Sequence, residues 1–164
     1  MTARRKRTEN ESVETQFHEL VSNAELSDVS FLEIHASHVD VEETSTSDHP
    51  AGESTMKVWY RAEGQQIQVR CRLDLQSSGA RFVADAVADF SVTGELPTDD
   101  AIREAFTQRI GVAVVYPYLR ESIHGMAQKI GVDTPILSLI ARKLKEIQSP
   151  IGESDQGAIR TAGQ

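Results

Sequence analysis

The sequence predicts an α+β fold, in which a four-stranded antiparallel sheet has one face covered by a long helix and a shorter C-terminal helix, with an extra helix before the first strand. Three observations carry this prediction. Residues 66–76 alternate between apolar and polar side chains, as a strand with one dry face does. Residues 98–130 repeat apolar side chains at helical spacing, and a stretch before residue 25 does the same.

The N-terminal segment divides into a basic tail and a helix. Residues 1–10 contain four basic side chains and one acidic one, and we expect them to form a disordered tail. From residue 11 the apolar side chains fall on one stripe of an amphipathic helix: Val13, Phe17, Leu20, Val21 and Ala24. Ser27 and Asp28 interrupt this period, and the stretch 29–41, rich in apolar and β-branched residues, predicts the first strand.

Three more strands are expected after a polar loop over residues 42–55, at 56–62, 66–76 and 80–92. The apolar face of the third strand consists of Ile67, Val69, Cys71, Leu73 and Leu75. The fourth strand places one set of side chains on the same inner face: Phe82, Ala84, Ala86, Ala88, Phe90 and Val92. Because its central inward residues are small alanines, we expect a helix to approach the sheet closely there.

Helical spacing begins after Pro97, with Thr98 as the expected cap, and Gly131 ends the long helix. Beyond Gly111 the apolar residues are spaced as in a heptad seam, which predicts packing against a second helix and therefore an oligomer interface: Val112, Tyr116, Leu119, Ile123, Met126 and Ile130. Thr134 and Pro135 have the chemistry that begins a last helix. A single domain is thus predicted over residues 11–148, followed by a disordered tail at 149–164.

Composition excludes several function classes. The 164 residues suit one domain, and the net charge of −8 argues against a nucleic-acid binder. The single cysteine, Cys71, cannot form an internal disulfide, which favours a reducing cytoplasm. The longest apolar run, Val112 to Tyr116, is far short of the ~20 residues that a membrane span requires. We expect a cytoplasmic protein without membrane insertion.

The search for catalytic chemistry returns no complete set. His35 and His38 are three residues apart on a strand and point to opposite faces, so we expect no metal site. No phosphate-binding or dinucleotide-binding motif occurs, and we expect no cofactor. Glu121 and His124 lie one turn apart on the long helix without a nucleophile near them in sequence. The only tryptophan, Trp59, shares the polar face of its strand, which is typical of a binding patch or, equally, of a side chain that the tail, the N-terminal helix or a second subunit covers.

Three segments together resemble one protein family. The run Val115-Tyr116-Pro117-Tyr118-Leu119-Arg120-Glu121 resembles the Leu-Phe-Pro-Tyr-Ala-Arg-Glu segment of the SecB family of export chaperones. Asp28-Val29-Ser30-Phe31 resembles the Asp-Ile-Ser-Phe of that family's first strand, and Phe90-Ser91-Val92-Thr93-Gly94 resembles its Phe-Ser-Ile-Ala-Gly. The resemblance runs from about Asp28 to Ile140.

The resemblance implies an ATP-independent holdase that keeps non-native polypeptides unfolded for the translocase motor SecA, and that assembles as a dimer of dimers. The implied client-binding groove lies near the junction of sheet and helix, with these candidates: Phe31, Trp59, Tyr116, Ile136, Leu137 and Ile140. Positions of the outer sheet face that match the family's SecA contacts are Asp28, Val83 and Asp85.

Two departures from the family pattern bear on the client. The family has Glu directly after the Phe of its first strand, where this chain has Leu32, with Glu33 one residue later. Because a shift of one residue turns a side chain to the opposite face, this departure argues against SecA docking. The helix at residues 11–25 is additional to the usual family pattern, and in this feature the chain resembles SecB-like chaperones that protect an antitoxin. Exported preproteins and an antitoxin therefore both remain as candidate clients.

Two other function classes stay open from the sequence. A small-ligand or hotdog-like enzyme domain would use Glu121, His124 or Asp85 and would need a deep closed pocket. A regulatory module would use the basic residues 1–10 on nucleic acid, with salt-sensitive binding.

Overall fold

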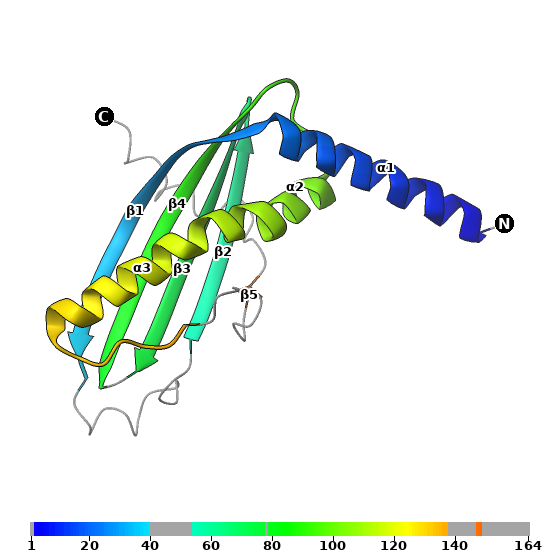
Figure 1. The fold of residues 1–164 in the computed structure, drawn as a ribbon. Coiled ribbons are helices and arrows are strands. Elements are labelled where there is room, and N and C mark those ends of the chain that lie inside the picture. The colour runs from blue at the N-terminus through cyan, green and yellow to red at the C-terminus, as the bar shows by residue number, and fades with distance from the viewer. Residues whose placement is uncertain (1, 40–53, 78, 138–146, 149–164) are drawn as a thin grey trace.

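The computed structural model describes residues 2–39, 54–77, 79–137 and 147–148. One twisted sheet with strand order β1-β4-β3-β2-β5 forms the first layer, and a long helical rod crosses its inner face as the second (Figure 1). The four long strands are antiparallel neighbours. The predicted α+β architecture, with a helix before the sheet and a long helix on one of its faces, is confirmed.

The strands are β1 (Ala24–His38), β2 (Ser54–Glu63), β3 (Gln66–Ser77) and β4 (Ala80–Val92). β1 begins five residues earlier than predicted, because it pairs with β4 from the partners Ala24 and Val92 onward. The inner faces predicted for β3 and β4 are confirmed, since every residue assigned to them is at most 4% exposed. Alternation therefore identified the dry face of the sheet correctly.

Helix α1 (Thr2–Asn23) corrects the prediction that residues 1–10 are a disordered tail, because the helix already begins at Thr2. Its predicted stripe is confirmed by Phe17 and Leu20, each 3% exposed. The guanidinium of Arg109 lies 4.0 Å from the ring centroid of Phe17 and forms an ion pair with Glu14 at 3.3 Å. The C-terminal half of α1 is thereby fixed to the helical rod, while its N-terminal half extends beyond the sheet (Figure 1).

The helical rod consists of α2 (Asp100–Phe106), a π-helical turn η2 (Thr107–Gly111) and α3 (Val112–Ile130). Its cap is Asp99 and not the predicted Thr98, because the carboxylate of Asp99 accepts a hydrogen bond from the Ala101 amide at 2.9 Å. Gly131 ends α3 as predicted, with a φ of 72° that favours glycine.

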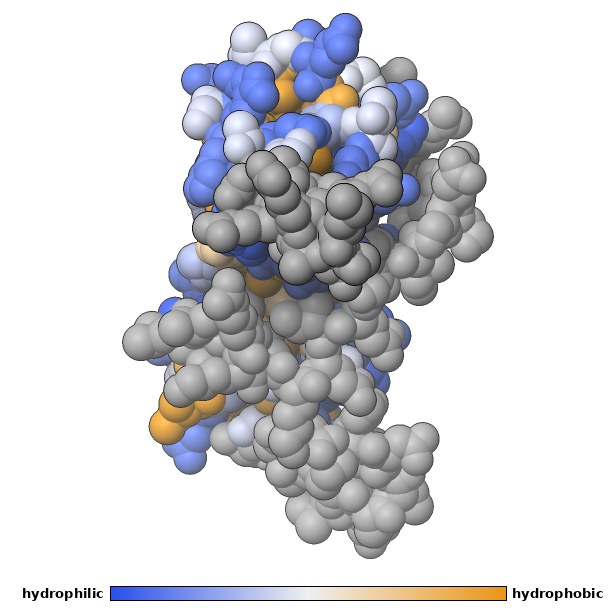
Figure 2. Space-filling view, turned by 90° about the vertical axis from the view of Figure 1, so that its right-hand side faces the viewer, coloured by the Kyte–Doolittle hydropathy of each residue, from blue (hydrophilic) through white to orange (hydrophobic). Residues whose placement is uncertain are grey.

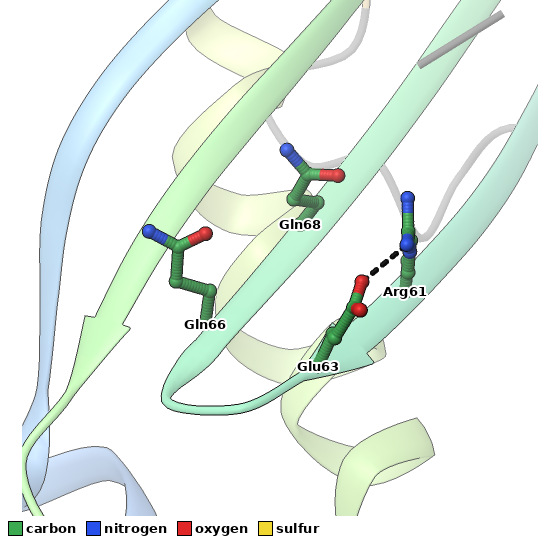
Figure 3. Close-up of a pocket in the computed structure, with 4 residues that line it drawn as sticks. All are labelled: Arg61, Glu63, Gln66 and Gln68. Atoms are coloured by element: carbon green, nitrogen blue, oxygen red, sulfur yellow. Dashed lines mark hydrogen bonds and ion pairs between the residues drawn. The ribbon is translucent and has the colours of Figure 1, made fainter. Parts of the chain in front are cut away.

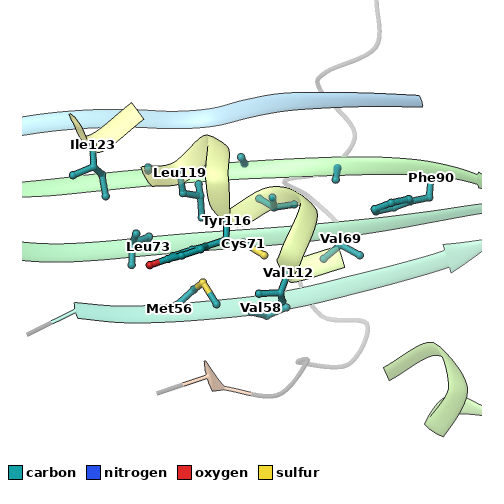
Figure 4. Close-up of a cluster of buried hydrophobic side chains, with 14 of the residues drawn as sticks. Met56, Val58, Val69, Cys71, Leu73, Phe90, Val112, Tyr116, Leu119 and Ile123 are labelled. Carbon is teal, nitrogen blue, oxygen red and sulfur yellow. The ribbon is translucent and has the colours of Figure 1, made fainter. Parts of the chain in front are cut away.

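The core lies between α3 and the inner face of the sheet. Side chains of α3 such as Val112, Tyr116 and Leu119 point toward the strands (Figure 4). The small inward residues of β4, Ala84, Ala86 and Ala88, are fully buried beneath the rod, as the sequence predicted. At η2 the approach is so close that a Cβ added to Gly111 would lie 2.6 Å from a methyl carbon of Val69.

This packing corrects the assignment of the heptad seam to an oligomer interface. Of the predicted seam, Val112, Tyr116, Leu119, Ile123 and Met126 are at most 7% exposed in the single chain, and the sixth member, Ile130, packs partly buried against the same core. The five buried side chains therefore offer almost no surface to a second subunit. Helical spacing fixes which residues share a stripe, but it does not distinguish a sheet from a helix as the partner.

The C-terminal prediction falls largely on residues that the structure does not describe. Of the expected last helix, Thr134–Leu137 are described and lie in no helix, whereas residues 138–146 are outside the described residues, as is the predicted tail at 149–164. Ile147–Gln148 form a short strand, β5, which pairs in parallel with Met56 and Lys57 of β2. Within the described residues, the sheet therefore consists of the four predicted antiparallel strands and one additional short parallel strand.

Candidate functional site

A row of exposed apolar side chains stands on the inner face of β1. Leu26, Phe31 and Ile34 are 43%, 37% and 52% exposed. They pair with Phe90, Ala86 and Ala84 of β4, which places them on the same face as the core. Because β1 is the outermost strand on its side of the sheet, no described strand lies beyond it to cover them. We refer to these three residues as the β1 apolar row.

Five of the six predicted groove residues are described, and these five do not come together, which corrects the prediction for them. Phe31 belongs to the β1 apolar row, whereas Trp59 lies on the outer face of β2 beneath the guanidinium of Arg70, 4.9 Å from the ring centroid. Tyr116 is only 2% exposed and belongs to the core. Burial raises the pKa of its hydroxyl.

The remaining groove candidates follow α3. Ile136 is fully exposed, and Leu137 packs against the core from a segment without regular structure. Ile140 lies outside the described residues. Ile136 and Leu137 are adjacent in sequence but lie in different environments. The reason is that the expected helix, which would have placed the groove candidates on one stripe, does not begin at Thr134.

The outer face of the sheet carries a connected set of ion pairs that the sequence analysis missed. The Asp85 carboxylate accepts hydrogen bonds from Arg70 at 2.9 and 3.0 Å and from Arg72 at 3.2 Å. Arg72 also pairs with Glu33, and this hydrogen bond raises the pKa of the Arg72 guanidinium. The signal was present in the alternation of β3, which puts both arginines on the face opposite Cys71.

A bulge in β1 accounts for the position of Glu33. The register between β1 and β4 shifts between Phe31 and Glu33, so that Leu32 is an extra residue in the strand. Phe31 therefore faces inward, while Glu33 faces outward opposite Asp85. The expectation that the one-residue departure would turn this glutamate to the other face is wrong, because the bulge absorbs it.

The three positions matched to a SecA contact are not equally accessible. Asp28 is exposed, but Val83 and Asp85 are 3% and 1% exposed. The charge of Asp85 is matched by two arginines of its own sheet. A basic partner can thus reach neither side chain in this arrangement, which corrects the prediction for these two residues.

A small polar pocket opens at the hairpin between β2 and β3, lined by Arg61, Glu63, Gln66 and Gln68 (Figure 3). Arg61 and Glu63 are paired with each other, and Gln68 donates to the Asp89 carboxylate at 2.6 Å. Three of the four lining side chains are therefore already engaged in polar contacts. Figure 2 views the molecule from the side on which β2 lies. The surface of the described residues is mainly hydrophilic there and carries small hydrophobic patches.

Of the three residues considered for an enzyme, Asp85 lies apart from the other two. Glu121 and His124 lie on the exposed side of α3, where the His124 ring contacts Gln128 at 3.0 Å, and Asp85 lies on the opposite side of the sheet. Burial and, secondarily, the charge of Asp85 raise the pKa of the Cys71 thiol to about 12.

Within the described ranges, no group of three potential metal-ligating side chains occurs. No helix in the described part of the chain combines the length and apolar character that a bilayer span requires.

Comparisons with known proteins agree with this architecture. No family model matches the chain. The SecB-like chaperone SmegB of Mycolicibacterium smegmatis is 30% identical over 122 residues, which cover 74% of this chain and 79% of SmegB. A SecB-like chaperone of Mycobacterium tuberculosis, solved with a ChAD peptide from the HigA1 antitoxin, aligns with a TM-score of 0.56 and 18% identity over 79% of this chain and 99% of its own.

A protein of unknown function from Streptococcus agalactiae has the same fold, with a TM-score of 0.57 and 6% identity over 71% of this chain and 97% of its own. The resemblance carried by the Tyr-Pro-Tyr-x-Arg-Glu segment is thus confirmed at the level of the whole domain. By sequence identity and coverage, the chain belongs to the family of SecB-like chaperones.

Proposed function

We propose that this protein is a holdase, which binds non-native polypeptides without ATP and keeps them from aggregating. The observation that carries the proposal is the β1 apolar row, where Leu26, Phe31 and Ile34 remain 37–52% exposed on a strand at the edge of the sheet. A folded domain gains nothing from leaving large apolar side chains in water, and such patches mark binding surfaces. The SecB-like relative supports the same function.

The energetics suit a weak and tolerant binder. Burying one large apolar side chain completely yields roughly 1.5–3 kcal/mol, and the row is already partly covered, so each contact contributes about half of that. Three such contacts do not give tight binding after the entropy of ordering an unfolded client. Several copies acting on one client multiply the effect without requiring a particular sequence.

For this reason the protein is expected to act as a homo-oligomer. We propose the dimer of dimers that the resemblance to the SecB family implies. The solvent side of α3 is the surface available for this contact, because its other side is buried on the sheet. Ala113, Pro117 and Tyr118 lie there, and Tyr118 is 43% exposed. The single cysteine, buried and reduced, is consistent with a cytoplasmic location.

Among the two client classes, the geometry favours an antitoxin over preproteins destined for SecA. Val83 and Asp85 are buried, and the Asp85 charge is matched by Arg70 and Arg72, which leaves Asp28 alone of the three matched positions exposed. The structural neighbour from Mycobacterium tuberculosis was solved with an antitoxin peptide, which supports the same choice.

The test is suppression of aggregation of a chemically denatured client by the purified protein, in buffer without nucleotide. We expect suppression at stoichiometric amounts, and at least a severalfold loss in the variant with Leu26→Ser, Phe31→Ser and Ile34→Ser. The matched control changes Glu25→Ser and His35→Ser on the opposite face of the same strand and should retain activity. A wild-type protein that fails to suppress aggregation would contradict the proposal.

The client class is tested separately. SecA should not co-purify with the wild-type protein. An antitoxin encoded beside the chaperone should be bound and protected from proteolysis. SecA binding that is abolished by Asp28→Ala would instead assign the protein to export.

A further inference from the structure

The two edges of the sheet differ in regularity. The pairing of β1 with β4 is interrupted twice, between Leu26 and Asp28 and between Phe31 and Glu33. β2 pairs with β3 in unbroken register along its whole length, from Ser54 to Glu63. A bulge disrupts the row of donors and acceptors that an edge presents, whereas a regular edge is a template for another extended chain. The β2 edge is therefore the better site for adding a strand.

One segment of the chain already lies on that edge. β5 pairs in parallel with β2 over two positions, Met56 with Ile147 and Lys57 with Gln148. Within the described residues, Val58–Glu63 have no strand on that side of β2. Strands in globular proteins are usually five or six residues long, and parallel pairing is slightly weaker per residue than antiparallel pairing. β5 thus holds the edge over a short length, and in the described part of the chain Val58–Glu63 remain without a neighbouring strand there.

We infer that β5 occupies the β2 edge as the chain's own stand-in for a client, and that an extended segment of a non-native polypeptide displaces it by adding to β2 along Met56–Glu63. This inference rests on the proposed holdase function and adds a second contact to the β1 apolar row on the opposite edge. Binding through main-chain hydrogen bonds requires no particular client sequence.

The side chains of β2 define which segments fit best. Met56, Val58 and Tyr60 face the core side, and Lys57, Trp59 and Arg61 face outward. A strand added to this edge places its own side chains beside these neighbours on each face. The outer row presents an exposed Lys57 ammonium and an indole stacked with Arg70. The favoured occupant is therefore an extended segment with apolar residues on one face and acidic or aromatic residues on the other.

Two full-length variants test the competition between β5 and a client. Lys57→Cys with Gln148→Cys joins two direct partners of adjacent strands, whose spacing suits a disulfide. Cys71 is fully buried and does not compete for the new thiols. Ile147→Pro with Gln148→Pro removes both β5 amide donors and releases the edge. A control with Ile147→Val and Gln148→Ala keeps both amides.

The probe is a fluorescent peptide with alternating leucine and glutamate, compared with a copy N-methylated at alternate residues, which cannot form strand hydrogen bonds. We expect the oxidised cysteine variant to bind it at least about tenfold more weakly and to recover on reduction. The proline variant should bind about fivefold more tightly, as if β5 covered the edge for about four-fifths of the time. The control should match wild type, and the methylated peptide should bind every variant equally.

Several results would overturn the inference. The first is that the oxidised cysteine variant binds the peptide with the same affinity as wild type. The second is that the two cysteines do not form a disulfide in the folded protein. The third is that wild type binds the methylated and unmethylated peptides equally well. These outcomes leave the holdase proposal standing if wild type still suppresses aggregation. Loss of aggregation suppression in wild type itself would remove both proposals.

Discussion

Replacing Gly111 by alanine tests how closely the helical rod must approach the sheet. The residue lies in the π-helical turn η2, above β3. An added Cβ would stand 2.6, 2.8 and 3.0 Å from Cγ2, Cγ1 and Cβ of Val69, a side chain with no solvent exposure. Separations below 3.0 Å require the rod or the strand to move, so the variant should lose stability.

The magnitude follows from two opposing terms. Forcing a methyl group into a filled core costs typically about 1–3 kcal/mol. Alanine in place of glycine in a helix returns about 0.5–1 kcal/mol through backbone entropy. The net loss should therefore be about 1–2 kcal/mol, or a fall in Tm of a few degrees for a domain of this size.

A matched control exists in the same rod. Gly125 lies in α3, and a Cβ added there would meet nothing within 4 Å. Gly125→Ala should therefore gain about 0.5–1 kcal/mol. Both substitutions gain the same backbone entropy from replacing glycine by alanine in a helix. The difference in the free energy of unfolding between the two variants therefore isolates the contact with Val69, and it should amount to about 1–3 kcal/mol.

Urea unfolding, followed by far-ultraviolet circular dichroism and by the fluorescence of Trp59, measures these differences. In a double-mutant cycle, Val69→Ala removes the two methyl groups that Gly111→Ala would strike. The pair should be coupled favourably by at least about 1 kcal/mol. Equal stability of the Gly111→Ala and Gly125→Ala variants, or absence of coupling to Val69, would refute the reasoning.

Three further predictions concern stability. Asp85→Ala leaves two arginines without their buried partner and should cost about 3–5 kcal/mol, whereas Asp74→Ala, which removes a largely exposed ion pair, should cost less than about 1 kcal/mol in the same urea assay. Because the pKa of the Cys71 thiol is raised from 9.0 to about 12, its stabilising contribution is complete below pH 9 and decreases as the pH rises toward 12. The slope is about 1.4 kcal/mol per pH unit, and Cys71→Ala should flatten this decline in denaturation curves measured across that range. Ile123→Asp places a charge at a position with no exposure and should unfold the chain, at a cost above about 4 kcal/mol; a folded variant that merely dissociates in sedimentation would restore the seam as an oligomer interface.

The sequence was sufficient wherever one periodicity has one structural meaning. The alternation from Ile67 to Leu75 admits only a strand with one dry face, and the structure buries those residues at 0–4% exposure. The stripe of Phe17 and Leu20 and the end of α3 at Gly131 are equally local, since they depend on side-chain spacing and on backbone conformation. The Tyr-Pro-Tyr-x-Arg-Glu segment identified the family on the same basis.

Tertiary structure decided what each stripe and each face meets. The stripe of Leu119 and Ile123 has the same spacing whether a second helix or the chain's own sheet covers it, and only the folded chain places it on the sheet. A bulge at Leu32, invisible in the pattern, returns Glu33 to the outer face beside Asp85. Whether an outward residue such as Asp85 is accessible depends on neighbours from other strands, because burial and charge pairing join residues far apart in the chain. For the same reason, the apolar character of Leu26 and Ile34 was evident in the sequence, but their exposure was decided by the position of β1 at the edge of the sheet.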